Sequence, residues 1–275
     1  MFDFLPLSST SYRRCMAIAT ISSLVGLSLN FNPSPTFAQS SSGGEQVVYV
    51  PQLQELQWQS WEDPPPGLPI RRGAAGSRTG CTMKPETGGE YQPLSSIVPI
   101  HTFGLTTQAS PTLYFYVPPN QVDVAEFVLE DQTGHQVVQV ELALNQQSGI
   151  VAVNLADLPN SPTLDVNRVY VGYFQLNCNG QLVDYVSTGI KRISLERTQQ
   201  AELAEGAIAD KIRFYTQNGI WYDLLQTLIE ADPDRSRLPL NLTTLFSAEK
   251  IELQHLLPVI NPSRPAALSL SPSMD

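Results

Sequence analysis

The sequence has few of the residues that most often build metal centres and nucleophilic active sites. Its 275 residues include three cysteines and three histidines. No two of them stand three or four positions apart, the spacing at which a helix presents two metal ligands on one face. We therefore expect no metal site and no cofactor.

Sequence motifs of catalysis are also scarce. The segment Ser247-Ala248-Glu249-Lys250 has the S-x-x-K spacing of penicillin-binding enzymes, but the partner motifs S-D-N and K-T-G are absent. Ser247 is expected instead to cap a helix that follows it, with Glu249 near the positive end of the helix dipole. We predict no catalytic residue, and a hydrolase is the least favoured class of function.

Basic residues and long apolar runs are few. The chain has 16 Lys and Arg against 26 Asp and Glu, a formal net charge of −10. A surface of this sign repels nucleic acid and anionic lipid. Beyond the N-terminal region no run of 18 apolar residues occurs, so we expect no integral membrane segment in the mature chain.

The N-terminal region has the order of a secretory signal. Arg13 and Arg14 precede the apolar run Cys15–Leu29, and small residues flank Phe37 at the expected cleavage site after Ala38. We expect residues 1–38 to be a cleaved signal peptide and the mature chain to be periplasmic or extracellular. The alternative is an uncleaved membrane anchor.

Two cysteines remain after this cleavage, Cys81 and Cys178. An isolated pair in an oxidising compartment usually forms a disulfide, and we expect one here. The alternative is two free, buried thiols.

Four regions follow the signal. Residues 39–94 are rich in proline and glycine and are expected to form an irregular arm. Residues 95–195 contain short β-branched and aromatic runs separated by turn signals, which favours an antiparallel, immunoglobulin-like β-sandwich of about seven strands. The strands are expected at 96–102, 112–117, 125–130, 137–144, 149–154, 168–177 and 182–193. The pair Asn179-Gly180 predicts a hairpin between the last two.

The period becomes helical in residues 196–258. One apolar stripe predicts a helix that Thr198 caps and Asn218-Gly219 ends. The stripe comprises Ala201, Ala204, Ile208, Ile212 and Tyr215. A second helix is expected from Ile220 to about Ala231, and a third after Ser247. Residues 259–275 are expected to be a flexible tail.

The chain resembles a cyanobacterial family of exported proteins known as domain of unknown function 928. The motifs that carry the resemblance, spread over residues 64–257, are Gly67-Leu68-Pro69-Ile70-Arg71-Arg72, Gly76-Ser77-Arg78-Thr79-Gly80-Cys81, Pro111–Pro118, Leu176-Asn177-Cys178, Gly189-Ile190-Lys191-Arg192-Ile193 and Gly219-Ile220-Trp221-Tyr222-Asp223. Residues 240–247 depart from the family pattern. The resemblance implies no established activity.

Two groups of residues, three arginines and two tyrosines, and the single residue Trp221 are candidate ligand or partner contacts. Arg71, Arg72 and Arg78 form a positive segment that either binds an anion or pins the arm by hydrogen bonds. Tyr114 and Tyr116 are expected to be partly exposed if their strand neighbours point into the core. Trp221 is either a partner contact or, as we favour, the core residue of the helical unit.

An acidic cluster near one turn allows two interpretations. Asp123, Glu126, Glu130 and Asp131 either bind calcium or, as we favour, form a solvated acidic edge that blocks strand-to-strand aggregation. The leading function is a non-enzymatic, exported interaction module that contacts another envelope protein. The alternative is a module that binds carbohydrate or peptide through exposed aromatic side chains.

Overall fold

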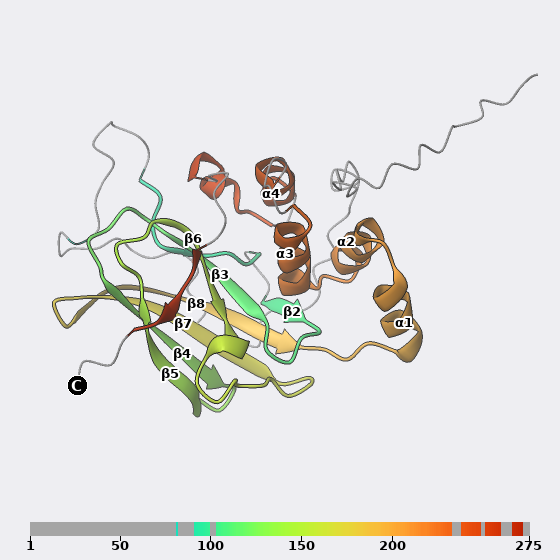
Figure 1. Cartoon of the computed structure of the whole chain (residues 1–275), viewed down its shortest axis with the longest axis horizontal. Helices are drawn as coiled ribbons and strands as arrows, with labels where there is room; N and C mark the ends of the chain where they lie inside the picture. The colour runs from blue at the N-terminus through green and yellow to red at the C-terminus, as the bar shows by residue number, and fades with distance from the viewer. Residues whose placement is uncertain are drawn as a thin grey trace, which may run out of the picture. The chain divides into compact units, whose positions relative to one another are not determined.

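The computed structural model describes residues 81, 91–99, 103–232, 238–248, 251–259 and 266–271 (Figure 1). All of them belong to one compact unit, Gln46–Asp275. The expected signal peptide and most of the expected arm lie outside the described residues. In the described part of the chain, no helix combines the length and the apolar character that a membrane crossing requires.

Two β-sheets form the larger part of the described chain. One sheet has the strand order β1-β3-β6-β9 and the other β10-β5-β4-β7-β8-β2. The strands are β1 (Ser95–Ser96), β2 (Gly104–Thr106), β3 (Thr112–Val117), β4 (Val124–Asp131), β5 (Gln136–Ala143), β6 (Gly149–Asn154), β7 (Val169–Cys178), β8 (Gln181–Arg192), β9 (Ala266–Ala267) and β10 (Ser269–Leu270).

The expected strands from residue 112 onward are confirmed to within two residues at either end. The predicted strand over 96–102 is wrong, because β1 joins one sheet and β2 joins the other. The expectation of purely antiparallel pairing also fails at two edges. β2 runs parallel to β8, and β9 runs parallel to β6. Both are short segments that add to an open sheet edge, where either strand direction satisfies the backbone.

The hairpin at Asn179-Gly180 is confirmed and joins the two longest strands. Both turn residues have positive φ, 51° at Asn179 and 74° at Gly180. This conformation suits a two-residue turn whose twist matches that of the strands. β7 and β8 pair in antiparallel fashion along nearly their whole length, with one irregularity at Leu176/Asn177.

The apolar core lies between the facing sides of the two sheets. Phe115 of β3 stacks on Phe174 of β7, with ring centroids 4.7 Å apart and an interplanar angle of 18°. Phe127 and Leu129 of β4 are fully buried and share one face of the strand. An offset aromatic pair of this kind adds about 0.5–1.5 kcal/mol to the burial of its area.

Cys81 and Cys178 form the expected disulfide. The bond joins two residues 97 positions apart, with Cα atoms separated by 6.5 Å. In the chain-entropy description, closing a loop of this length stabilises the fold by about 4–5 kcal/mol. Next to the bond, the carbonyl of Cys81 accepts a hydrogen bond of 2.9 Å from the amide of Gln121.

The first predicted helix is in fact two. α1 (Arg197–Glu205) and α2 (Ile208–Gln217) are separated by Gly206, whose backbone is extended at φ −68° and ψ 145°. Glycine is a poor helix residue, and it breaks the helix that the apolar stripe predicted. α1 begins at Arg197 rather than after Thr198, because the side chain of Gln199 accepts from the amide of Glu196 in a capping box.

α2 ends at Asn218-Gly219 as predicted, with Gly219 at a φ of 61°. α3 (Trp221–Glu230) follows and matches the second expected helix. It lies beside β2, with α2 next to it (Figure 1). The helical unit therefore docks on the sheets through α3.

The third predicted helix is wrong. α4 (Leu238–Phe246) ends before Ser247, and the 3₁₀-helix η3 (Gln254–Val259) takes the place of the expected helix. Ser247 therefore follows a helix instead of capping one. The apolar residues within 242–246 recur at helical spacing and indicate a helix before Ser247, which the sequence analysis overlooked.

The tail that we predicted to be flexible contains β9 and β10. The amide of Leu268 donates to the carbonyl of Ala152 in β6 at 3.2 Å, and that of Ser271 donates to Glu141 in β5 at 2.9 Å. The segment thus reaches the edges of both sheets, which offer otherwise unpaired backbone groups.

The contact between β2 and α3 generates a prediction at Gly104. A Cβ atom at this position would lie 2.2 Å from Cε2 of Tyr222. We expect Gly104→Ala to lower the free energy of unfolding by roughly 1–3 kcal/mol or more, as overpacking does. In a Tyr222→Leu background the same substitution should cost at least about 1 kcal/mol less. Urea unfolding of the four proteins of the double-mutant cycle measures this, and equal costs in both backgrounds would contradict the packing described.

Candidate functional site

The expected exposure of Tyr114 and Tyr116 is wrong. Their side chains are 5% and 4% exposed, and Phe115 between them is fully buried. Residues of both faces of β3 are buried, and α3 contacts this strand. At the edge of β3 the pairing with β1 continues, because the amide of Ile97 donates to the carbonyl of Tyr114 at 3.0 Å. Burial, and then the neighbouring phenol of Tyr91, raise the pKa of Tyr116 to about 12. Neither tyrosine offers a surface to a ligand.

Trp221 occupies the core, as we favoured. It is fully buried, and its Nε1 donates to the carbonyl of Ile97 at 2.8 Å. Arg71, Arg72 and Arg78 lie outside the described residues.

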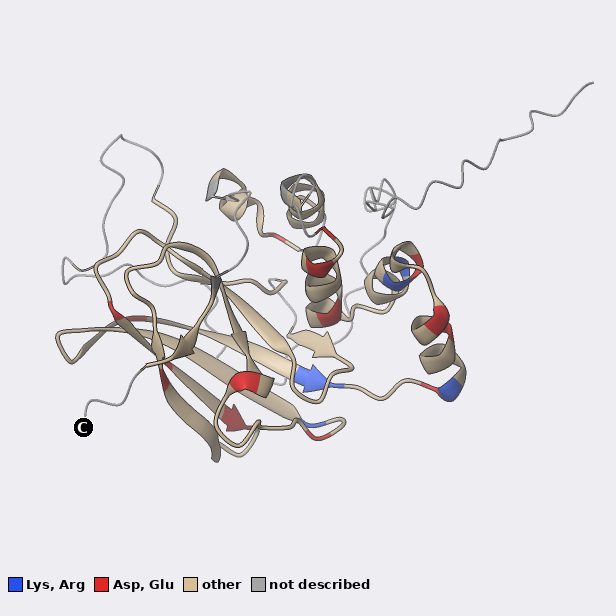
Figure 2. Ribbon diagram, in the orientation of Figure 1, with Lys and Arg blue, Asp and Glu red and all other residues tan. Residues whose placement is uncertain are grey.

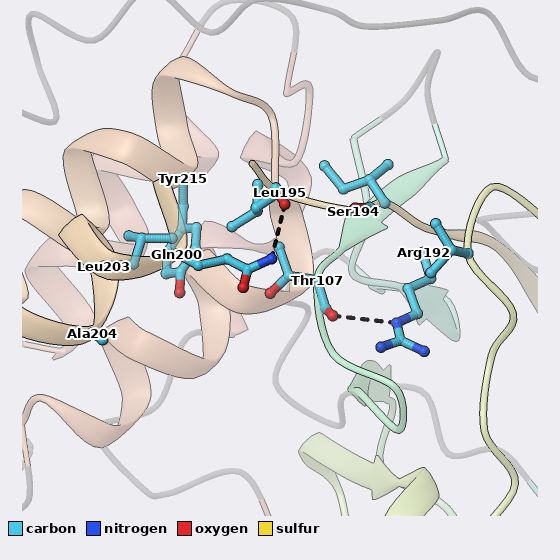
Figure 3. A pocket seen from close by; sticks show the side chains of 10 residues that line it. Thr107, Arg192, Ser194, Leu195, Gln200, Leu203, Ala204 and Tyr215 are labelled. Carbon is cyan, nitrogen blue, oxygen red and sulfur yellow. Dashed lines mark hydrogen bonds between the residues drawn. The ribbon is translucent and has the colours of Figure 1, made fainter. Parts of the chain in front are cut away.

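A hollow of about 400 Å³ lies where β8 ends and the helical unit begins (Figure 3). We call it the Arg192 groove. It is lined by Thr107, Val166, Arg192, Ile193, Ser194, Leu195, Gln200, Leu203, Ala204 and Tyr215. Its walls come from four places: the connection after β2, the segment before β7 that holds Val166, the end of β8 with the residues that follow it, and the helices α1 and α2. Several short segments distant in sequence thus meet at one surface.

Arg192 is held by backbone carbonyls. Its Nη1 donates to the carbonyl of Leu164 at 2.9 Å, and its Nε donates to that of Thr107 at 3.4 Å. Among the described residues no carboxylate forms an ion pair with it. The guanidinium therefore keeps its full charge beside the groove, since a carbonyl neutralises no charge.

α1 forms the opposite wall. Figure 3 shows Leu203 and Ala204 across the hollow from Arg192. Leu203 is half-buried and Ala204 is exposed, and no residue of α1 is buried. Gln200 holds the start of the helix to the connection, since its Nε2 donates to the carbonyl of Leu195 at 2.8 Å. The groove therefore has an apolar wall on a helix that contributes little to the core.

A buried carboxylate lies behind Thr107. Asp223 of α3 accepts from Thr106 Oγ1 at 2.7 Å, from the amide of Thr107 at 3.1 Å and from Thr107 Oγ1. Burial raises the pKa of Asp223, and these hydrogen bonds oppose that shift. Burial, and then the charge of Asp223, raise the pKa of Tyr215 to about 12. The carboxylate thus fixes the connection that carries one wall of the groove.

A second hollow of about 370 Å³ lies along the same connection, and Ile193, Ser194 and Leu195 line both. Lys191 and Asn218 are among its other lining residues. The chain between β8 and α1 is therefore flanked by two hollows, and the two basic residues that end β8 line one each.

The largest of the three hollows, about 640 Å³, is acidic. Asp123, Glu126 and Glu141 line it, at the end of the sheet that holds Cys178. Glu126 accepts from the side chain of Gln139, so part of its charge is already hydrogen-bonded. Among the described residues no group of three or more His, Cys, Asp or Glu side chains is arranged to hold a metal ion. Calcium binding by this cluster therefore has no structural support within them.

Asp131, which the sequence analysis placed in the same acidic cluster, has partners of its own. Asp131 accepts from the hydroxyl and the amide of Thr133 and forms an ion pair of 3.4 Å with Arg168. The pKa of Asp131 is lowered, first by the hydroxyl of Thr133 and then by its amide.

The sequence interpretation missed Arg192 and Asp223. Both stood inside motifs that carry the family resemblance, Gly189–Ile193 and Gly219–Asp223. A charged residue at the end of a buried strand or in the first turn of an apolar helix was the signal available. The partners of these residues, Thr107 for both and Leu164 for Arg192, are far away in sequence, and no local pattern indicates them.

The raised pKa of Asp223 predicts a pH-dependent effect of Asp223→Asn. A carboxyl whose pKa is higher in the folded state contributes stability that is lost as pH rises above the unfolded value near 3.9 and through the folded value. The variant lacks this loss of stability. Its free energy of unfolding, which is lower than that of the unchanged protein, should therefore approach that of the unchanged protein between about pH 4 and pH 7. Urea unfolding at several pH values measures the difference. A difference that grows with pH would show that the threonine donors, not burial, dominate.

Comparison with known proteins gives one assignment. No curated protein matches the chain. The apo structure of Bacteroides uniformis beta-glucuronidase 3 aligns with 10% sequence identity and a TM-score of 0.23, over 38% of this chain and 12% of that one. A similarity this low supports no argument about fold or activity. The model of the Domain of Unknown Function DUF928 matches residues 73–257, which is more than half of the chain. The chain therefore belongs to the DUF928 family.

Proposed function

We propose that the protein is a non-enzymatic, exported module that contacts another protein of the cell envelope through the Arg192 groove. The observation that carries the proposal is α1, a nine-residue helix that buries no side chain but turns Leu203 toward the groove. A helix gains most of its stability in a protein from packing an apolar face. A partner that packs on α1 would supply that packing.

Polar residues at the start of α3, next to the wall that carries Thr107, act as structural contacts. Asp223 is hydrogen-bonded to Thr106 and Thr107, and Tyr222 shares a hydrogen bond of 2.7 Å with Thr188. These pairs hold α3 to the sheets and present no nucleophile beside a general base. They support binding in preference to catalysis.

Export is part of the proposal. The Cys81–Cys178 disulfide is compatible with an oxidising compartment, where such bonds persist. The signal-like N-terminal sequence supports the same location. We further propose that the two sheets are an immunoglobulin-like sandwich, from the number and spacing of the short strands, and that the source is cyanobacterial, from the family resemblance. The alternative of a carbohydrate or peptide site on exposed tyrosines loses its support, because Tyr114 and Tyr116 are buried.

Site-specific photo-crosslinking in cells that naturally make the protein tests the proposal. A photo-reactive residue at Ala204, exposed on the groove side of α1, should capture one defined envelope protein. The matched control is Leu182, which is 53% exposed at the opposite end of β8. Leu203→Glu should abolish the capture from Ala204 by placing a charge on the apolar wall.

Capture of the same proteins from Ala204 and Leu182, or no capture from either, would contradict the proposal. A reproducible enzymatic turnover that a point mutation abolishes would also contradict it.

A further inference from the structure

We infer that the Arg192 groove recognises an acidic segment of the partner, in which a carboxylate meets Arg192 and a neighbouring branched apolar side chain packs on α1. The inference rests on the proposed function and names the chemistry of the partner. Three observations on the described residues support it: none of their carboxylates pairs with Arg192, none of their acidic side chains lines the groove, and an apolar wall lies opposite the arginine.

The charge of Arg192 is available to a ligand. A guanidinium has five N–H donors, and the two hydrogen bonds to the carbonyls of Leu164 and Thr107 occupy two of them. These bonds also fix the plane of the group. A positioned guanidinium loses little conformational freedom when it binds a carboxylate, and it binds one in a two-pronged geometry that a lysine cannot match.

The lining of the groove contrasts with the rest of the chain. The sequence has a net charge of −10, yet none of the ten described residues that line the groove is acidic. Figure 2 shows basic residues at the end of β8, whereas the helices carry basic and acidic residues together and several strands carry acidic ones. The acidic hollow lined by Asp123, Glu126 and Glu141 would repel the same ligand. Charge complementarity therefore selects the Arg192 groove for an anionic segment.

The apolar wall specifies the second element. Leu195 and Leu203 are half-buried and pack against the core, and they line the groove together with Val166. A volume of about 400 Å³ is in the range of small-ligand pockets, which suits one or two side chains of a peptide. A leucine-like side chain next to an aspartate or glutamate would fill the hollow and reach Arg192 on its opposite side.

Small fragments that carry both elements test the inference. The ¹⁵N-labelled, oxidised protein is titrated with 4-methylpentanoate, which joins a leucine-like branch to a carboxylate, and with its neutral isostere 4-methylpentanamide. The backbone amide signals of Ser194 and Ala204 should shift saturably with the carboxylate, while that of Leu182 stays in place. The dissociation constant should be at least tenfold lower for the carboxylate than for the amide.

Two variants assign the preference to charge. Arg192→Gln should bind both fragments with equal affinity. Because Arg192 also holds two carbonyls, that variant is paired with Ala204→Glu, which adds an anion at an exposed position of the groove and leaves those hydrogen bonds intact. Ala204→Glu should lose the carboxylate preference. Ala201→Glu carries the same charge on an exposed position of α1 outside the groove lining and should keep it.

Equal affinity of the two fragments for the unchanged protein would overturn the inference. So would the absence of saturable shifts with both, or a preference that survives Ala204→Glu. The two proposals fail separately. If crosslinking from Ala204 captures a partner but the fragments show no preference, the interaction module stands and its acidic ligand is wrong. If the fragments bind as expected but nothing is captured, the groove recognises carboxylates and the protein-contact function is wrong.

Discussion

The anchoring of α3 to the two sheets is the constraint on which the rest of the structure depends. Three consecutive residues at its start bind three different segments. Trp221 donates to the carbonyl of Ile97, Tyr222 bonds to the hydroxyl of Thr188, and Asp223 accepts from Thr106 and Thr107. The bonds to Ile97, Thr188 and Thr106 are buried, where an unpaired partner would cost about 1–3 kcal/mol, and the bond to Thr107 is partly buried. The helix is therefore fixed in position and in rotation.

The position of α3 determines that of the groove. α2 packs on α3, and α1 is linked to α2 only through Gly206 and Ala207. The other end of α1 leads back to β8 through residues 193–196, with the side chain of Gln200 bound to the carbonyl of Leu195. α1 is thus held at both ends across a hollow and packs weakly in between. A segment with this arrangement can adjust to a partner without disturbing the core.

Local sequence signals predicted most of the strands and little of what surrounds them. Asn179-Gly180 specified its hairpin because the turn conformation depends on those two residues alone, and two remaining cysteines left one disulfide to expect. Tyr114 and Tyr116 were misplaced because alternation describes the faces of one strand and says nothing of a helix, here α3, that contacts the strand. The break at Gly206 had a local signal, a glycine inside a helical pattern. The sequence analysis gave more weight to the stripe of apolar residues than to this glycine. The partners of Arg192 and Asp223 could not be predicted, since each is distant in sequence. Strand pairing with β8 brings Thr107 and Leu164 to Arg192, and the docking of α3 brings Asp223 to Thr106 and Thr107.

Native-state hydrogen exchange tests most directly whether α3 is an integral part of the fold. The amides of Leu224 and Leu225 in α3 should exchange with a free energy of opening close to that of Phe174 in β7, because one cooperative unit contains all three. The amides of α1 should exchange with a much lower free energy, since that helix buries no side chain. Exchange of Leu224 and Leu225 as fast as that of α1 would show that the helical unit opens independently of the sheets, and it would contradict this account.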